Sequence, residues 1–515
     1  MPVKTIVKPS EYHDSVSLML VAQELARLPG VIDAAVVMAT EANKGILKEA
    51  GLLTPEADAA SPNDLVIAVS AADESLSGAL AEVERLLQKK GAEGETSEFR
   101  PKTIRGAVKS NPAANLAVVS VAGRYAADES WEALHKGLHV LLFSDNVSLA
   151  DEIALKQYAS QHGLLLMGSG AGTAILNGVA LGFANVLPEG PVGIVSAAGT
   201  GLQEVSTLLA RSGVGITQGI GTGGRDLKED VGGIMMLAGV KALQEDPATQ
   251  VILLVSKPPA PAVARKVLDQ VAKSAKPAVV CFLGGDFGEA SQAANLYPAR
   301  TLEEAARLAA CLAKSEPVEE TTMAVDYPGV IEELRLGLRP GQCYLRGLFS
   351  GGTLCYEAQV IWRELLDEPV FSNAPLEAAQ QLPDSTQSLR HSAIDLGEEE
   401  FTVGRLHPMI DNDLRIRRLL QEARDPEVAV VLLDVVIGYG AHPDPAAELG
   451  PAISKARALA AQGDGKLVVV ASVTGTEQDP QRMSRQVEAL EQAGAIVCAS
   501  NAAAARLVAR VVAAG

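Results

Sequence analysis

Short apolar runs alternate along most of the chain with longer stretches of helical spacing. Gly193–Ser196 is such a run, helical spacing follows over Gly201–Arg211, and a second apolar run ends in the glycine-rich stretch Gly219–Gly224. Strands that are apolar throughout are typical of parallel sheets covered by helices. This pattern predicts a doubly wound α/β domain, with its ligand-binding loops at the carboxyl ends of the strands.

The same pattern returns further along the chain. In both places a strand ends in serine, passes through Gly-Thr and places a glutamate four residues after the threonine. The two sets are Ser196, Gly199, Thr200 and Glu204, and Ser350, Gly352, Thr353 and Glu357. Because the first N–H groups of a helix are unpaired and carry positive dipole charge, each turn predicts a cradle for phosphate or carboxylate. We infer two tandem domains of one fold.

A stricter β-α-β pattern begins at Asn115. One strand reaches Gly123, and a later one enters a glycine-rich loop. This spacing predicts a Rossmann-type domain. The candidate cofactor-binding residues are Gly123, Gly168, Gly170, Gly172 and Thr173.

The expected fold class is α/β, and a length of 515 residues corresponds to about three domains. We expect an N-terminal small α/β domain, a Rossmann-type domain, and two tandem flavodoxin-like domains. Their limits are 1–108, 109–187, 188–315 and 328–515, with an acidic linker at 316–327.

Composition narrows the range of partners. The net charge of -19 argues against nucleic acid as a partner, because the sequence has no basic stripe that would neutralise phosphates. No long apolar run predicts a membrane span or a leader, so we expect a cytoplasmic protein. The five cysteines are scattered and odd in number, which predicts neither a disulfide framework nor a metal site.

Two further segments hold candidate chemistry. In the glycine-rich loop, Gly221, Gly223 and Gly224 let the backbone approach a ligand, and Arg225 could clamp an anion or form a surface ion pair. The second segment contains Arg405 and His407 among carboxylates. His407 could be a general base, a phosphoryl acceptor or a salt-bridged structural residue.

Several motifs together resemble the FdrA family, acyl-CoA synthetase-like proteins related to succinyl-CoA synthetase. The resemblance covers essentially the whole chain. Its most specific segments are SAAGTGLQEV (196–205), GIGTGGRDL (219–227), FTVGRLHPMID (401–411) and LLDVVIGYGAHPDPA (432–446).

The resemblance implies that 109–187 matches the CoA-binding domain of the synthetase α subunit and 188–315 its ligase domain. It implies that 328–515 matches the carboxyl-terminal domain of the β subunit. In the synthetases, two helix N-termini point at one phosphohistidine. This chain departs from them, because it has no histidine between His162 and His391 and no room for an ATP-grasp domain.

Members of the FdrA family in allantoin breakdown are assigned to an oxamate carbamoyltransferase, acting with two other proteins and using carbamoyl phosphate. Those members share Pro-Asp-Cys where this chain has Ser169, Gly170 and Ala171. Our expectation is a subunit that transfers an acyl or carbamoyl group to or from phosphate. The alternatives are an acyl-CoA ligase with an ATP-grasp partner, and a non-catalytic scaffold.

This expectation assigns roles to residues. Ser196, Gly199, Thr200, Ser350, Gly352 and Thr353 would bind the anion, Arg225 and Arg405 would neutralise it, and His407 would transfer a proton. Expected ligands are a small anionic substrate, phosphate or carbamoyl phosphate, with CoA as a candidate cofactor. We expect a homo-oligomer with partner subunits of the same pathway.

Overall fold

The computed structural model describes residues 3–9, 11, 15–26, 28–71, 78, 81–83, 85–86, 101–285, 293–318, 328–402, 405–463 and 465–513. These residues form two compact units: residues 1–110 with 399–406, and residues 111–398 with 407–515. We call them the N-terminal unit and the main unit. Most of the expected linker, 319–327, lies outside the described residues.

The N-terminal unit holds an antiparallel sheet of order β1-β3-β2. Its core combines buried residues of β3, such as Leu65 and Ile67, with Leu18 and Leu25 of the first helix. The elements are β1 (Val3–Lys8), α1 (Ser15–Ala26), β2 (Val31–Met38), α2 (Glu41–Glu49), α3 (Pro55–Asp58), β3 (Leu65–Ala71), α5 (Ile104–Ser110) and α14 (Glu399–Thr402).

The main unit starts with three parallel strands in the order β4-β5-β6. Their elements are β4 (Leu116–Val119), α6 (Gly123–His135), β5 (His139–Leu142), α7 (Leu149–Gln161) and β6 (Leu166–Met167). The predicted β-α-β pattern is therefore present in this segment.

The next sheet has seven strands in the order β13-β12-β11-β9-β10-β7-β8. Its five parallel strands have the flavodoxin-like order, and the antiparallel hairpin β7–β8 extends one edge. Its elements are β7 (Thr173–Leu176), β8 (Val179–Gly182), β9 (Glu189–Ser196), α8 (Gly199–Arg211), β10 (Ile216–Gly221), α9 (Ile234–Glu245), β11 (Val251–Ser256), α10 (Pro261–Ala272), β12 (Ala278–Phe282), β13 (Leu296–Pro298) and α11 (Leu302–Ala313). We call residues 188–315 the first repeat.

The second repeat, residues 328–515, has six parallel strands in the order β15-β16-β14-β17-β18-β19. Apart from β15 at the edge, the strand order is again flavodoxin-like. Its elements are α12 (Pro328–Arg335), β14 (Tyr344–Phe349), α13 (Gly352–Leu365), β15 (Val370–Ser372), η2 (Ala378–Gln380), β16 (His391–Asp395), α15 (Asp413–Glu422), β17 (Val428–Val436), α16 (Pro445–Gln462), β18 (Val468–Thr474), α17 (Met483–Gln492), β19 (Ile496–Cys498) and α18 (Asn501–Val512).

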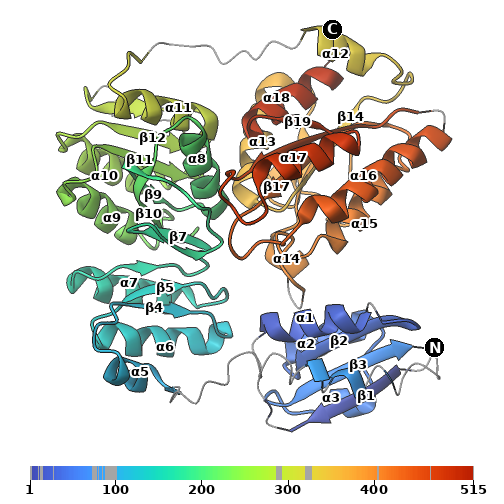
Figure 1. Ribbon diagram of the computed structural model, residues 1–515, viewed down its shortest axis with the longest axis horizontal. Helices are drawn as coiled ribbons and strands as arrows, with labels where there is room; N and C mark the ends of the chain where they lie inside the picture. The colour runs from blue at the N-terminus through green and yellow to red at the C-terminus, as the bar shows by residue number, and fades with distance from the viewer. Residues whose placement is uncertain are drawn as a thin grey trace. The chain divides into compact units, whose positions relative to one another are not determined.

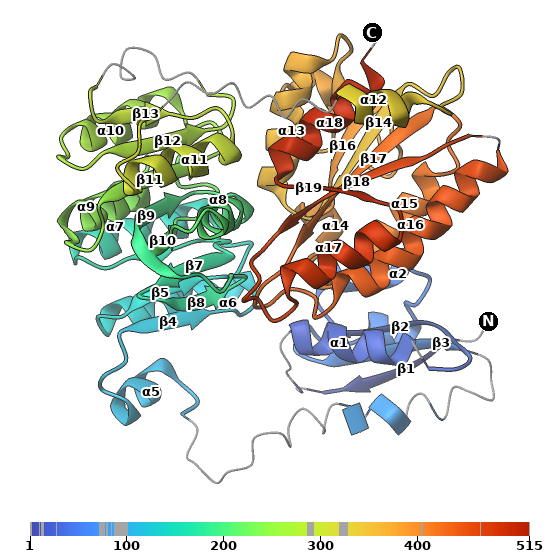
Figure 2. The same ribbon diagram turned by 45° about the horizontal axis from the view of Figure 1, so that its top comes forward.

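The two repeats pack through matching helices. Figure 1 shows α8 and α11 of the first repeat on the side that faces α13 and α18 of the second. The buried cluster is continuous across this junction, for example from Leu202 and Ala309 to Leu354 and Val508. Turned forward, the sheets of both repeats are seen with helices on their two faces (Figure 2). The predicted α/β class with two tandem flavodoxin-like domains is confirmed.

One assignment differs from the expectation. Residues 173–182 were placed with the Rossmann-type domain, but β7 pairs with β10, so the hairpin belongs to the sheet of the first repeat. The reason is geometric: β10 would otherwise be an open edge strand, and the hairpin supplies partners for its backbone.

Candidate functional site

The first cradle lies between β9 and α8, as predicted. Ser196 is buried, and its hydroxyl accepts from the Ala198 N–H at 3.1 Å and donates to the Ala198 carbonyl at 2.8 Å. This hydroxyl therefore stabilises its own turn. Gly199 and Thr200 then begin α8 without a side-chain cap.

Two glycine-rich loops lie against this helix start. A Cβ atom at Gly223 would come within 2.7 Å of the Ser169 carbonyl oxygen, and one at Gly221 would collide with the Thr173 carbonyl. The Thr173 hydroxyl lies 3.6 Å from the Cβ position of Gly199. The predicted phosphate-binding and cofactor-binding loops are thus neighbours. These glycines allow backbone to approach backbone.

Arg225 takes part in a buried ion network. Its guanidinium lies 2.6 Å from Glu152 and donates to the Ser169 hydroxyl at 2.5 Å. Lys156, fully buried, lies 2.8 Å from Glu152 and 2.9 Å from Asp226. The network joins α7 to the loop after β10. A role for Arg225 in ligand binding remains a prediction, and it would have to act from within these pairs.

The second cradle is filled by a side chain of the protein. The Asp434 carboxylate accepts from the Ser350 N–H at 2.7 Å, the Gly351 N–H at 2.8 Å and the Ser350 hydroxyl at 3.0 Å. Arg415, also buried, lies 3.3 Å from the same carboxylate. The sequence analysis missed both residues. The available signal was that Asp434 is the one charged residue in the otherwise apolar strand VAVVLLDVV.

The starts of α8 and α13 meet each other. A Cβ atom at Gly351 would lie 2.8 Å from Thr200 Cγ2, and one at Gly201 would lie 3.0 Å from Thr353 Cγ2. Each helix start therefore packs on the threonine of the other. Two positive dipole ends are brought to one place, which favours an anion between them.

Two charged groups lie beside this junction. Asp395, at the end of β16, is 2% exposed, and its Oδ2 is the atom nearest to the Cβ position of Gly352. Lys257, which follows β11, places its Nζ 3.5 Å from that position. Burial is the main cause that raises the pKa of Asp395 to about 7, and Lys257 opposes it. Lys257 was missed as a site residue, although it follows a strand directly in the SKPP motif.

His407 is placed at the second cradle. Its Nε2, the Ser350 carbonyl oxygen and Asp395 Oδ1 lie 2.9, 2.9 and 3.2 Å from the Cβ position of Gly397. Its Nδ1 accepts from the Met409 N–H at 3.2 Å, so a neutral ring carries its proton on Nε2. Burial, assisted by Arg415, lowers the pKa of His407 to about 4. The neutral ring therefore presents an Nε2–H group on this side, and the role of His407 in proton transfer remains a prediction.

Two other predicted site residues belong to other parts of the fold. Arg405 is exposed and belongs to the N-terminal unit, so its role remains a prediction. Gly123 begins α6, where a Cβ atom would lie 2.6 Å from the Asn146 carbonyl oxygen. It permits a close approach of two loops, and its role in cofactor binding also remains a prediction.

The repeated glutamates cap helices across the junction. Glu204 of the first repeat accepts from the Asn501 N–H, at the start of α18, at 3.0 Å. Glu357 of the second repeat accepts from the Leu302 N–H, at the start of α11, at 2.6 Å. Burial raises the pKa of Glu204, and raises that of Glu357 to about 8. The shared offset thus reflects a reciprocal structural contact.

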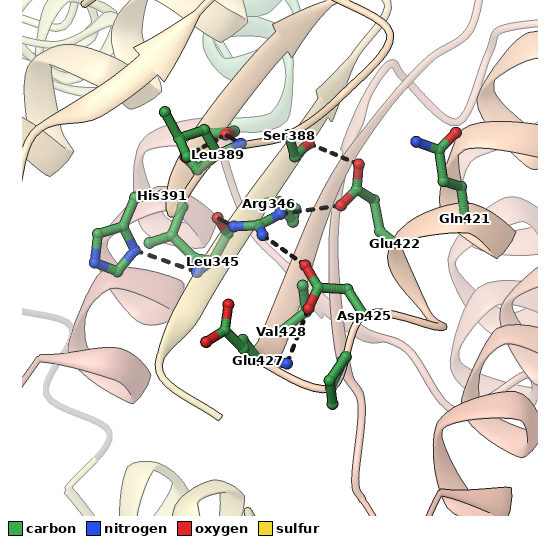
Figure 3. Close-up of polar contacts among 12 residues, drawn as sticks. Leu345, Arg346, Ser388, Leu389, His391, Gln421, Glu422, Asp425, Glu427 and Val428 are labelled. Carbon is green, nitrogen blue, oxygen red and sulfur yellow. Dashed lines mark hydrogen bonds and ion pairs between the residues drawn. The ribbon is translucent and has the colours of Figure 1, made fainter. Parts of the chain in front are cut away.

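A separate polar cluster lies toward the amino ends of the strands of the second repeat (Figure 3). Arg346 is 3.0 Å from both Glu422 and Asp425, and Ser388 donates to Glu422 at 2.6 Å. His391 Nδ1 accepts from the Leu345 N–H at 3.2 Å. These groups satisfy one another at the end of the sheet away from the cradles, which is the pattern of a structural network.

Family models match three parts of the chain. The model for the AllF heavy metal-associated domain matches residues 1–102, that for a CoA binding domain matches 189–284, and that for CoA-ligase matches 348–511. The uncharacterized protein YahF of Escherichia coli (strain K12) is 46% identical over 506 residues, which is 97% of each chain. The chain belongs to the same family as YahF.

More distant relatives match a smaller part of the chain. The α subunit of an ADP-forming succinate–CoA ligase from Methanothermobacter thermautotrophicus is 25% identical over 28% of this chain and 48% of its own length. One from Staphylococcus epidermidis is 28% identical over 29% and 49%. The chain spans about half the length of these subunits.

Among solved structures, the dinucleotide-forming acetyl-coenzyme A synthetase 1 of Ca. Korarchaeum cryptofilum covers 82% of this chain, and the match covers 86% of its own chain. The sequence identity is 14% and the TM-score 0.37. The family models and relatives confirm the resemblance to succinyl-CoA synthetase at the level of the domains. The CoA binding match falls on the first repeat, whereas the sequence analysis assigned CoA to 109–187. The domain limits remain a prediction.

The heavy metal in the name of the N-terminal model is not matched by the residues. Positions 1–102 contain no cysteine, the ligand that soft metals prefer. Among the described residues, no group of three or more histidine, cysteine or acidic side chains could hold a metal ion. None of the described helices is long and apolar enough to span a membrane.

Proposed function

We propose that the chain handles a phosphorylated small acyl or carbamoyl group at the junction of α8 and α13, as a subunit of an enzyme that transfers this group to or from phosphate. The observation that carries the proposal is the contact of Thr200 with Gly351 and of Thr353 with Gly201. It directs two helix starts, with their unpaired N–H groups, at one anion.

The neighbouring charges support this function. Lys257 adds a cation beside the start of α13, and His407 offers an Nε2–H donor near the Ser350 carbonyl. A group transfer from phosphate develops negative charge on oxygen, which fixed donors and dipoles stabilise. Neither a phosphohistidine nor an ATP-grasp domain is required for this chemistry. A small anionic substrate and partner subunits of the same pathway are parts of the proposal.

The second candidate is a CoA-thioester ligase that acts with an ATP-grasp partner. The matches to CoA binding and CoA-ligase domains favour it. In this case CoA would lie against the loop Gly168–Thr173, next to the first cradle.

The test is ligand-dependent stability and protection of the full chain. Carbamoyl phosphate, acetyl phosphate, phosphate and CoA would each be added at increasing concentration, since a ligand at a hundred times its Kd stabilises by about 2.7 kcal/mol. We expect carbamoyl or acetyl phosphate to raise Tm and to slow hydrogen exchange at 199–203 and 352–356. The variant Thr200→Val should weaken this effect, and Thr386→Val, an exposed control, should not.

The outcomes separate the candidates. Protection by CoA alone, confined to 168–173, would favour the ligase. No stabilisation by any of these compounds would contradict both and would favour a scaffold.

A further inference from the structure

Asp395 is a fixed and buried carboxyl. Its backbone N–H donates to the Asn373 Oδ1, and its carbonyl accepts from the Asn373 Nδ2, both at 2.9 Å. Oδ1 accepts from the Gly397 N–H at 3.0 Å. Within the part of the chain that the structure describes, Oδ2 has no hydrogen-bond partner, and this oxygen points at Gly352. One oxygen is therefore held and the other is available at the start of α13.

Charged groups from several elements face this carboxyl. Lys257, from the loop after β11, favours its ionised form, while Glu398 and Asp434 of β17 disfavour it. Arg415 of α15 is paired with Asp434, so its charge is largely neutralised. The remaining neighbours are the uncharged ring of His407 and the thiol of Cys355 in α13, whose pKa burial raises well above its usual value. Lys257 is the one cation near Asp395 without an ion pair among the described residues.

An oxyanion at the junction would meet Asp395 at close range. If the carboxyl were ionised, two negative charges would share a buried site, which is strongly unfavourable. If it were protonated, Oδ2 could donate a short hydrogen bond to the anion. Since the pKa of Asp395 is about 7, the proton is available near neutral pH.

We propose that Asp395, rather than His407, holds the exchangeable proton of this site: it takes up one proton when an oxyanion binds between the starts of α8 and α13, and donates it as a hydrogen bond from Oδ2. Lys257 balances the charge of the same anion. The inference rests on the proposed function, because that function supplies the anion. The proton comes from solvent and returns to it when the anion leaves, so the exchange is balanced without a co-reactant.

The experiment uses sulfate as the probe, because sulfate has the size of phosphate but does not titrate near neutral pH. Calorimetric titration of the full chain, at constant ionic strength and in two buffers with different ionisation enthalpies, gives both Kd and the protons taken up. We expect uptake close to one proton at pH 8 and much less at pH 6. Linkage then makes the Kd for sulfate about tenfold weaker at pH 8 than at pH 6.

Variants assign the proton to its residue. Asp395→Asn keeps a hydrogen-bond donor without the charge, so we expect similar Kd values at pH 6 and pH 8 and no proton uptake. Asp269→Asn, at an exposed position on α10, should keep the wild-type pH dependence. Lys257→Met should weaken sulfate binding about tenfold and move the onset of the pH dependence upward, because Lys257 lowers the pKa of Asp395.

The inference and the proposed function fail differently. Sulfate binding with no proton uptake, or an unchanged pH dependence in Asp395→Asn, would overturn the inference and leave the proposed function standing. Absence of binding by sulfate, phosphate and carbamoyl phosphate at every pH would overturn both. The proton count is made on the unaltered chain, so it decides the matter even if Asp395→Asn does not fold.

Discussion

The two repeats have the same strand order and the same serine-to-glutamate spacing, but they neutralise their helix starts differently. In the second repeat, Asp434 closes the turn after β14 and is itself held by Arg415. In the first repeat, the corresponding part of β11 is apolar, with Leu254 and Val255, and the Ser196 hydroxyl serves its own turn.

The difference shows that a repeated motif can keep its backbone geometry while the charges around it differ. The backbone geometry is common to both repeats because the two helix starts must meet, each on the threonine of the other. The charge is not common. In the second repeat, the Asp434 carboxylate accepts from the N–H groups of the turn and leaves those that follow, at the start of α13, for an external anion. In the first repeat, the Ser196 hydroxyl closes the turn before α8.

The largest expected effect is from Asp434→Ala. The substitution leaves Arg415 buried and unpaired and removes the acceptor from two backbone N–H groups, so we expect the free energy of unfolding to fall by about 3–5 kcal/mol. Urea denaturation of the full chain measures this. Phosphate or sulfate should restore part of the loss in this variant, because the emptied turn could then bind an external anion.

The matched control is Asp413→Ala, an exposed carboxylate on α15. Surface changes of this kind usually cost less than about 1 kcal/mol. If Asp434→Ala also lowered the free energy of unfolding by less than this, the Asp434 carboxylate would not stabilise the second cradle, and the contrast with the first would fail.

The glutamates test what the repeats have in common. Glu204→Ala and Glu357→Ala each leave a buried helix-start N–H of the other repeat without an acceptor, which costs about 1–3 kcal/mol. We expect similar losses from the two variants and a double variant whose loss is not their sum, because Asn501 contacts both side chains. If the stability losses of the two single variants added up to the loss of the double variant, Glu204 and Glu357 would not be coupled through Asn501.

The pH dependence gives Glu357 a signature of its own. Its pKa is raised from 4.5 to about 8 by burial, so the unfolded chain releases this proton first as the pH rises. The protonated carboxyl of Glu357 therefore contributes to stability below about pH 4.5. This contribution is lost as the pH rises from about 4.5 to about 8. Glu357→Gln should therefore show a flatter stability profile than the wild type over this window.

Much of this arrangement follows from the sequence. Apolar strands, helix spacing and the repeated Ser/Gly-Thr turns predicted both flavodoxin-like domains. The start of α8, at Gly199, lies within two residues of the expected Gly201, since a tight turn fixes where the helix begins. The contact between the repeats was not predictable, because the partners Asn501 and Leu302 lie far from Glu204 and Glu357 in sequence. The role of Asp434 was not predictable for the same reason. A single charged residue in an apolar strand indicates that it has a polar partner, but the sequence does not show which residue this is.

The contact between helix starts gives the next effect. Gly351→Ala would bring a methyl group within 2.8 Å of Thr200 Cγ2, and such overpacking costs about 1–3 kcal/mol. It should also weaken anion binding, because the two starts are pushed apart. Combining it with Thr200→Ser, which removes the opposing methyl group, should recover part of the stability in a double-mutant cycle.

Gly463→Ala is the control, because its Cβ would meet only the Ala460 carbonyl oxygen at 3.6 Å. No coupling between positions 351 and 200 would contradict the packing of one helix start on the other.

The smallest expected effect is the difference in stability between the two serine variants. Ser350→Ala removes a hydroxyl that donates to the Asp434 carboxylate, and hydrogen bonds to charged groups contribute about 1.5–3 kcal/mol. Ser196→Ala removes contacts with the neutral backbone of Ala198, which contribute about 0.5–1.5 kcal/mol. Thermal denaturation should therefore rank Ser350→Ala as the more destabilising change. Equal losses would mean that the Asp434 charge adds nothing to its turn, and the contrast between the two cradles would then rest on geometry alone.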